Sequence, residues 1–162
     1  MKRDNGINRL RLFINSLRDR HRPPTIDFES VIIDWELPHN LSSAVSSIFT
    51  SLSYPRKYRT LALQTAKSCL EWQRYEILHS QSKTPESKSE PSDMVDHPDH
   101  YSKGRKYEPI EVIEDWNLGF HIGNALKYIS RVGRKGDPIQ DLEKAEFYLE
   151  REIENLNKKN GI

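Results

Sequence analysis

Two short stretches of the sequence place charged residues and tyrosines at steps of three, four and three, a spacing that brings side chains onto one face of a helix. The first face comprises His121, Asn124, Tyr128 and Arg131. The second comprises Asp141, Lys144, Tyr148 and Arg151. Lys127 borders the first face, and a basic turn at residues 131–137 lies between the two faces.

This turn combines cations with glycines, which suits phosphate binding. Arg131, Arg134 and Lys135 supply positive charge, and Gly133 and Gly136 allow backbone amides to approach a ligand closely. Guanidinium groups make paired, charge-assisted hydrogen bonds to phosphate oxygens, and tyrosine rings can stack on a base. We therefore predict a nucleotide site. The sequence contains neither a Walker loop nor a Gly-x-Gly-x-x-Gly motif, so the predicted site is of another kind.

A turn upstream, His97-Pro-Asp-His-Tyr101, adds His100 and Tyr101 to the candidate ligand-binding residues. Two histidines three residues apart also suit zinc, but Pro98 disfavours a helix and no cysteine pair accompanies them. We predict a positioning turn, with an ordinary hydrogen-bonded loop histidine as the alternative for His100. Asp137 or Asp141 could hold Mg²⁺ through the phosphates of a nucleotide such as ATP.

Helical signals surround these residues and predict an all-α fold. Pro109 suits the first turn of a helix that runs toward Gly119, a second helix is expected over 120–132, and Asp137-Pro138 opens a third. The third helix carries an apolar face at Ile139, Leu142, Ala145, Leu149, Ile153 and Leu156. No strand signal of comparable strength occurs.

The segment 31–48 resembles the segment 112–129 without a gap. Seven of the 18 pairs are identical, including Asp34/Asp115 and Trp35/Trp116, whereas chance gives roughly one. After a two-residue slip, the register resumes with Ala66/Ala145, Leu70/Leu149 and Glu71/Glu150. We predict an internal duplication with three helices per copy. The copies should pack on each other or between chains, because a unit of roughly 60 residues is marginal alone.

The first copy keeps the apolar positions, which predicts a scaffold role for Val112, Trp116, Ala125 and Ile129. It loses both polar faces: the counterparts are Asn40, Ser43, Ser47 and Thr50, and then Ala62, Thr65, Cys69 and Trp72. The second of these faces has become largely apolar and is expected to serve packing. Charged helix faces are also commonly solvated for no special reason, so plain solvation is the alternative for the second copy. The candidate ligand-binding residues are His100, Tyr101, His121, Asn124, Lys127, Tyr128, Arg131, Arg134, Lys135, Asp141, Lys144 and Tyr148.

Composition divides the chain into three parts. Residues 1–78 hold the first copy and an amino-terminal helix predicted before Pro23-Pro24. Residues 79–96 are rich in Ser, Lys, Glu and Pro and are predicted to be a disordered linker. Residues 97–162 form the predicted nucleotide-binding domain.

The bulk numbers exclude several classes of function. The chain has 162 residues, 35% hydrophobic and 30% charged, with no apolar stretch that could span a bilayer or serve as a signal peptide. Cys69 is alone, which fits a reducing cytoplasm. We expect a cytoplasmic protein without a membrane partner. A net charge of +1 argues against bulk nucleic-acid binding, although arginines at positions 9–22 leave a nucleic-acid adaptor open.

The motifs resemble one known family, the phage-associated SaV-like family, over about residues 95–156. The resemblance is carried by His97-Pro-Asp-His-Tyr101, Gly123-Asn-Ala-Leu-Lys-Tyr128, Arg131-Val-Gly-Arg-Lys135 and Asp141-Leu-Glu-Lys-Ala145. It implies a helical, nucleotide-handling protein of a phage or prophage in a bacterial host, and one relative is a nucleotide kinase of a T-odd coliphage.

Two nucleotide-handling functions stay open beside the less favoured nucleic-acid adaptor. One is a kinase-like phosphotransferase that uses ATP and Mg²⁺, with the cations supplying charge neutralisation. The other is a binder that sequesters a nucleotide without catalysis, for example against host defence. We expect a homo-oligomer in either case, and the sequence assigns no catalytic residue.

Overall fold

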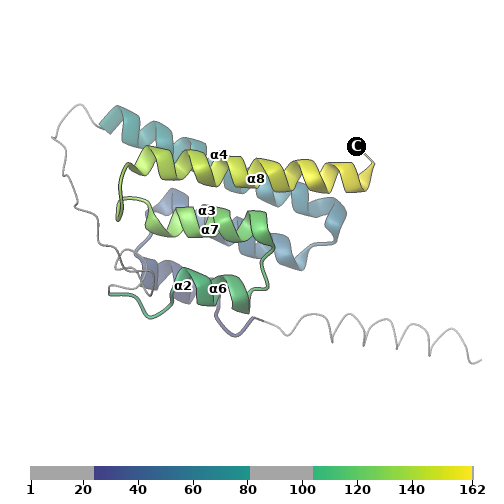
Figure 1. The fold of residues 1–162 in the computed structure, drawn as a ribbon, viewed down its shortest axis with the longest axis horizontal. Helices are drawn as coiled ribbons and strands as arrows, with labels where there is room; N and C mark the ends of the chain where they lie inside the picture. The colour runs from purple at the N-terminus through teal and green to yellow at the C-terminus, as the bar shows by residue number, and fades with distance from the viewer. Residues whose placement is uncertain (1–23, 81–103, 162) are drawn as a thin grey trace, which may run out of the picture.

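A computed structural model describes residues 24–80 and 104–161, and these residues form α-helices and no strand. The first unit contains α2 (Phe28–Trp35), α3 (His39–Ser53) and α4 (Arg56–Ser80). The second contains α6 (Pro109–Asp115), α7 (Phe120–Arg131) and α8 (Pro138–Asn160). Figure 1 shows three tiers, with α4 and α8 at the top, α3 and α7 in the middle, and α2 and α6 below. The all-α class and the three helices per unit are confirmed.

Some predictions fall outside the described residues or shift in extent. The predicted amino-terminal helix and positions 81–96 of the predicted linker lie outside them, while His79 and Ser80 belong to α4. In the part of the chain that the structure describes, no helix has both the length and the apolar character needed to cross a membrane.

Side chains near the first turns explain where α6 and α8 begin. Asp137 accepts a hydrogen bond from the Ile139 amide at 2.9 Å, which caps α8 as the Asp-Pro pair predicted. A capping box links Glu108 and Glu111 at the start of α6. That helix ends at Asp115, earlier than the apolar spacing predicted.

The early end of α6 has a backbone cause that recurs in the first unit. Asn117 adopts a left-handed conformation with φ 49°, which a right-handed helix cannot contain. Glu36, which follows α2, has φ 51° and stands at the corresponding position of the first unit. Among the described residues these two alone have positive φ without being glycine. Both short helices therefore end in the same turn.

The two units hold each other by a reciprocal pair of carboxylates. Asp115 of the second unit accepts hydrogen bonds from the backbone amides of residues 25 and 26, both at 2.8 Å, and from the Thr25 hydroxyl. Asp34 of the first unit accepts from the backbone amides of residues 106 and 107, at 2.8 and 2.9 Å. Each aspartate thus binds the segment through which the chain enters the other unit.

The neighbouring tryptophans repeat this exchange. Trp116 donates its indole N–H to the Ile26 carbonyl at 2.7 Å, and Trp35 donates to the Tyr107 carbonyl at 2.8 Å. A buried indole needs an acceptor, and each one finds it on the opposite unit. We call the seven hydrogen bonds of these aspartates and tryptophans the crossed clamp.

The core is built from corresponding positions of the two units. All of these side chains are at most 7% exposed. The pairs are Val31/Val112, Trp35/Trp116, Leu41/Ile122, Ala44/Ala125, Val45/Leu126, Ile48/Ile129, Leu63/Leu142, Ala66/Ala145 and Leu70/Leu149. Burial confirms the predicted scaffold role of Val112, Trp116, Ala125 and Ile129, whereas a duplication as the origin of the two units stays a prediction.

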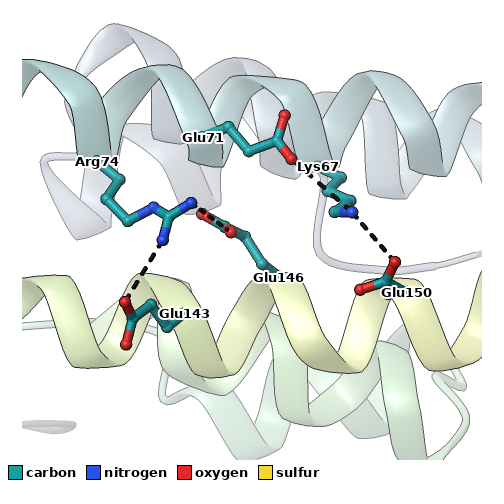
Figure 2. Close-up of polar contacts among 6 residues, drawn as sticks. All are labelled: Lys67, Glu71, Arg74, Glu143, Glu146 and Glu150. Atoms are coloured by element: carbon teal, nitrogen blue, oxygen red, sulfur yellow. Dashed lines mark hydrogen bonds and ion pairs between the residues drawn. The ribbon is translucent and has the colours of Figure 1, made fainter.

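The long helices α4 and α8 lie side by side and exchange ion pairs (Figure 2). Arg74 contacts Glu143 and Glu146, with nitrogen–oxygen distances of 3.4 and 3.3 Å, and Lys67 contacts Glu150 at 3.4 Å. Burial raises the pKa of Glu146, and the charge of Arg74 opposes that rise. Partly exposed pairs of this kind stabilise weakly, so the apolar core holds the helices together.

Candidate functional site

The polar faces of α7 and α8 meet at a pair of tyrosines. The rings of Tyr128 and Tyr148 are stacked, with centroids 5.9 Å apart and an interplanar angle of 12°. Three cationic groups surround the Tyr128 ring: Arg131 at 4.8 Å, Lys127 at 5.1 Å and Lys144 at 5.6 Å from its centroid. All three lie within cation–π range. We call these five residues the Tyr128 cluster.

Further aromatic rings extend from the cluster toward the start of α7. His121 lies 6.3 Å from Tyr148 between ring centroids, and Phe120 lies 5.9 Å from the same ring. Phe147 contacts Tyr148 edge-on at 5.4 Å. Phe120 is 71% exposed, so an open aromatic surface borders the cluster.

Sequence reasoning missed the two phenylalanines of this surface. The alignment of the two units contains the signal, because the first unit has His39 where the second has Phe120 and Ser68 where it has Phe147. Both residues are replaced by a polar side chain in the first unit, so a comparison that looked for any difference between the units, and not only for lost polar faces, would have found them.

A buried ion pair joins two of the predicted site residues. The Nε and Nη2 atoms of Arg131 donate to Oδ1 of Asp141 at 2.9 and 2.6 Å. The Asp141 side chain is only 1% exposed, and that of Arg131 is 17% exposed. The second carboxylate oxygen, Oδ2, is buried without a hydrogen-bond partner. Asp141 therefore supports Arg131 from beneath rather than standing on an open helix face.

The turn after α7 has the backbone form that its glycines predicted. Gly133 and Gly136 have φ of 75° and 65°, in the left-handed region that favours glycine. Arg134 and Lys135 between them are exposed. The turn leads directly into the first turn of α8, whose amino terminus carries partial positive charge.

Three other predicted residues are not brought into the cluster by the described structure. The Asn124 side chain donates to the Phe120 carbonyl at 2.7 Å, a bond within its own helix. His100 and Tyr101 lie outside the described residues, as does the predicted alternative of zinc at His97 and His100.

The described residues offer little for a metal ion. Within residues 24–80 and 104–161, no three His, Cys, Asp or Glu side chains come together as potential ligands. Asp137 caps α8, and Asp141 already accepts two hydrogen bonds from Arg131. A set of Mg²⁺ ligands is therefore not assembled by these residues alone.

Arg105 is a cation that the sequence did not single out. Its guanidinium lies 5.1 Å from the Trp35 ring centroid and donates to the carbonyl of Ser130 near the end of α7. Burial and the nearby charge of Arg134 lower the pKa of Arg105 to about 10, while Asp34 opposes that change. The residue ties the end of α7 to the first unit.

The first unit has an open groove where the second has the Tyr128 cluster. A groove of about 580 Å³ between α3 and α4 is lined by Ser46, Ser47, Thr50, Tyr54, Pro55, Tyr58, Leu61, Ala62 and Thr65. Five of these positions correspond to Lys127, Tyr128, Arg131, Asp141 and Lys144. Small side chains in the first unit thus leave space that large polar side chains fill in the second.

The described residues leave much of this side of the first unit exposed. Leu61 is 70% exposed and Trp72 is 58% exposed. Of the predicted packing face, Thr65 and Trp72 are exposed in the described part of the chain, whereas Ala62 and Cys69 are partly buried and Cys69 packs against the core. The units pack mainly through their cores, the crossed clamp and the α4–α8 contact.

Comparisons with known proteins give one partial match. Residues 95–150 match the model of a family described as a protein of unknown function (DUF3310). The matched residues include α6, α7 and the first part of α8. Searches of the curated proteins and of the solved structures gave no match.

Proposed function

We propose that the α7–α8 face of the second unit binds a nucleotide. The Tyr128 cluster carries this proposal: three cationic groups lie 4.8 to 5.6 Å from one tyrosine ring, which itself stacks on a second. Cations recognise phosphate, and aromatic rings stack on any base because every base has a π face.

The arrangement along α7 favours one orientation of the ligand. Exposed Phe120 begins the helix, and Arg131 ends it roughly 16 Å away. The base would lie toward Phe120 and Tyr148. The phosphates would lie toward the three cations of the Tyr128 cluster and the 131–137 turn, because an anion there relieves the repulsion between neighbouring positive charges.

Lys127 and Lys144 are the cations best placed to respond to a ligand. Each lies near the Tyr128 ring, and both are partly exposed. The Lys144 ammonium donates to the neutral side-chain amide oxygen of Gln140, at 2.6 Å. Arg131 differs, because a buried carboxylate already offsets its charge.

Binding without catalysis is the function that this geometry favours. Sequestration of a nucleotide needs cations and stacking surfaces, and it needs no metal ligands or general base. The resemblance to the SaV-like family and its nucleotide kinase makes phosphoryl transfer the second candidate. One observation favours that candidate, since Asp141 keeps a carboxylate oxygen without a hydrogen-bond partner. We propose no step through a metal ion, because no three potential metal ligands come together among the described residues.

Calorimetric titration with the deoxynucleoside mono- and triphosphates, each with and without Mg²⁺, tests the proposal. Lys127→Ala and Lys144→Ala should each weaken binding roughly tenfold or more, because a hydrogen bond to a charged group contributes about 1.5–3 kcal/mol. Ser46→Ala and Thr65→Ala change the corresponding positions of the first unit and should leave affinity unaltered.

Chromatography of the same mixtures separates the two candidates. Recovery of unchanged nucleotide supports sequestration, whereas diphosphate product from ATP and a monophosphate supports phosphoryl transfer. Absence of binding across the whole panel, or equal losses in the serine and threonine controls, would overturn the nucleotide site in the second unit.

A further inference from the structure

The outer face of α4 carries an apolar stripe that no described residue covers. Its members follow one another at steps of three and four, the spacing of a helix seam, and all are exposed. The seam consists of Tyr58, Leu61, Thr65, Ser68, Trp72, Tyr75 and His79. The core side chains Leu63 and Leu70 project from the other side of the same helix.

Bulky and small side chains follow one another along the seam in nearly the same order in both directions. Tyr58 and Leu61 are bulky at the start, Trp72 and Tyr75 are bulky toward the end, and the middle positions carry a small threonine and a small serine. A helix with this pattern is complementary to itself when reversed. Antiparallel pairing of two copies sets Tyr58 against Tyr75 and Leu61 against Trp72.

We propose that the protein forms a dimer in which α4 pairs in antiparallel orientation with α4 of a second copy. In this dimer Trp72 and Tyr75 of each copy lie over the first-unit groove of the other. The groove of about 580 Å³ is of the size that protein pockets use to bury bulky groups. It borders the seam at Tyr58, Leu61 and Thr65.

Charge along α4 favours the antiparallel orientation. The first turn carries Arg56, Lys57 and Arg59 without an acidic residue. The second half exposes Glu71 and Glu76. Its arginine, Arg74, is paired with Glu143 and Glu146 of α8. Antiparallel pairing brings each basic end beside the acidic half of the other copy, whereas parallel pairing would place the basic ends together.

The exposed area is adequate for a dimer. Tyr54, Tyr58, Trp72 and Tyr75 are each about half exposed, so each ring has on the order of 100 Å² left to bury. With Leu61 and the lining of the groove, the total approaches the roughly 800 Å² per partner of a standard interface. Trp72 and Tyr75 are already stacked, with centroids 5.6 Å apart, which lowers the entropy lost on pairing.

Sedimentation of the full chain tests the dimer, and the result does not depend on the nucleotide site. Wild-type protein should sediment as a dimer at micromolar concentration and above. Leu61→Glu places a carboxylate against Trp72 of the second copy and should give a monomer with unchanged helix content. Ile33→Glu is the matched control, because Ile33 is 76% exposed on α2, and this variant should remain dimeric. A monomeric wild type, or an assembly that survives Leu61→Glu, overturns the proposal.

Disulfide formation tests the orientation. In a Cys69→Ser background, Tyr58→Cys mixed with Tyr75→Cys should give a cross-linked dimer under oxidation. Neither variant alone should cross-link, because equivalent positions would lie roughly 25 Å apart along the paired helices. Cross-linking of each variant with itself, without the mixed product, would indicate parallel pairing and contradict the proposed geometry.

Discussion

Replacing Arg131 and Asp141 together should cost much less stability than replacing Arg131 alone. Arg131→Thr leaves Asp141 buried, 1% exposed, without the two hydrogen bonds from the guanidinium. Removal of one partner from a buried ion pair costs about 3–5 kcal/mol. Since Arg131 lies at the edge of the core, 17% exposed, we expect about 3 kcal/mol.

The other two variants complete a double-mutant cycle. Asp141→Ala should cost about 1–2 kcal/mol, because the remaining guanidinium can turn toward water. The double variant recreates the Thr50 and Ala62 combination of the first unit, which the fold accommodates there. It should therefore lie within about 1 kcal/mol of wild type, which gives a coupling energy of about 3–5 kcal/mol.

Urea unfolding followed by far-ultraviolet circular dichroism measures the three free energies. Equal instability of the double variant and Arg131→Thr would refute the reasoning, because it would show that the cost does not come from a stranded carboxylate. The cycle also bears on ligand binding. Arg131 supports the fold, so a loss of affinity in an Arg131 variant does not by itself place Arg131 at the ligand.

Two further predictions concern the paired features of the two units. Glu36→Gly should raise the free energy of unfolding by about 0.5–1 kcal/mol in denaturant titrations, because glycine adopts positive φ without strain. Asn117→Gly should give a smaller gain in the free energy of unfolding, since asparagine tolerates positive φ better than glutamate does. A loss of stability in Glu36→Gly would contradict the strain argument. Asp34→Ala should cost about 2 kcal/mol and Asp115→Ala about 3 kcal/mol, because each removes charge-assisted hydrogen bonds of the crossed clamp. Glu114→Ala, on an exposed neighbour, should change stability by less than about 0.5 kcal/mol, and an equal effect in this control would exclude the clamp as the cause.

Local signals in the sequence predicted the helices well. The Asp137-Pro138 start of α8 and the buried face that contains Leu142 and Leu149 depend on residues within a few turns of one another. Such patterns are visible along the chain because helical spacing alone decides which side chains share a face. The end of α6 was less predictable, since apolar residues continue to Leu118 while the backbone turns at Asn117.

Contacts between elements were beyond this kind of reasoning. The sequence places Arg131 and Asp141 on the faces of two separate helices. Only the packing of α7 on α8 brings the two side chains into contact. The identity of Asp34 and Asp115 in the alignment indicated a shared structural role. It did not indicate that each residue binds the opposite unit, because spacing within a segment carries no information about a partner 72 or more positions away.

The crossed clamp also determines how the molecule can come apart. A hinge motion between the units would have to break seven hydrogen bonds on two aspartates and two tryptophans together. The covalent connection through residues 81–103 keeps the two units at a high effective concentration, whereas the crossed clamp and the shared core fix how they sit on each other. We therefore expect that a chain cut within that connection would remain one particle, with the first-unit groove and the Tyr128 cluster keeping their relative positions. The two units therefore associate as two subunits of a complex would, through contacts rather than through the chain that joins them.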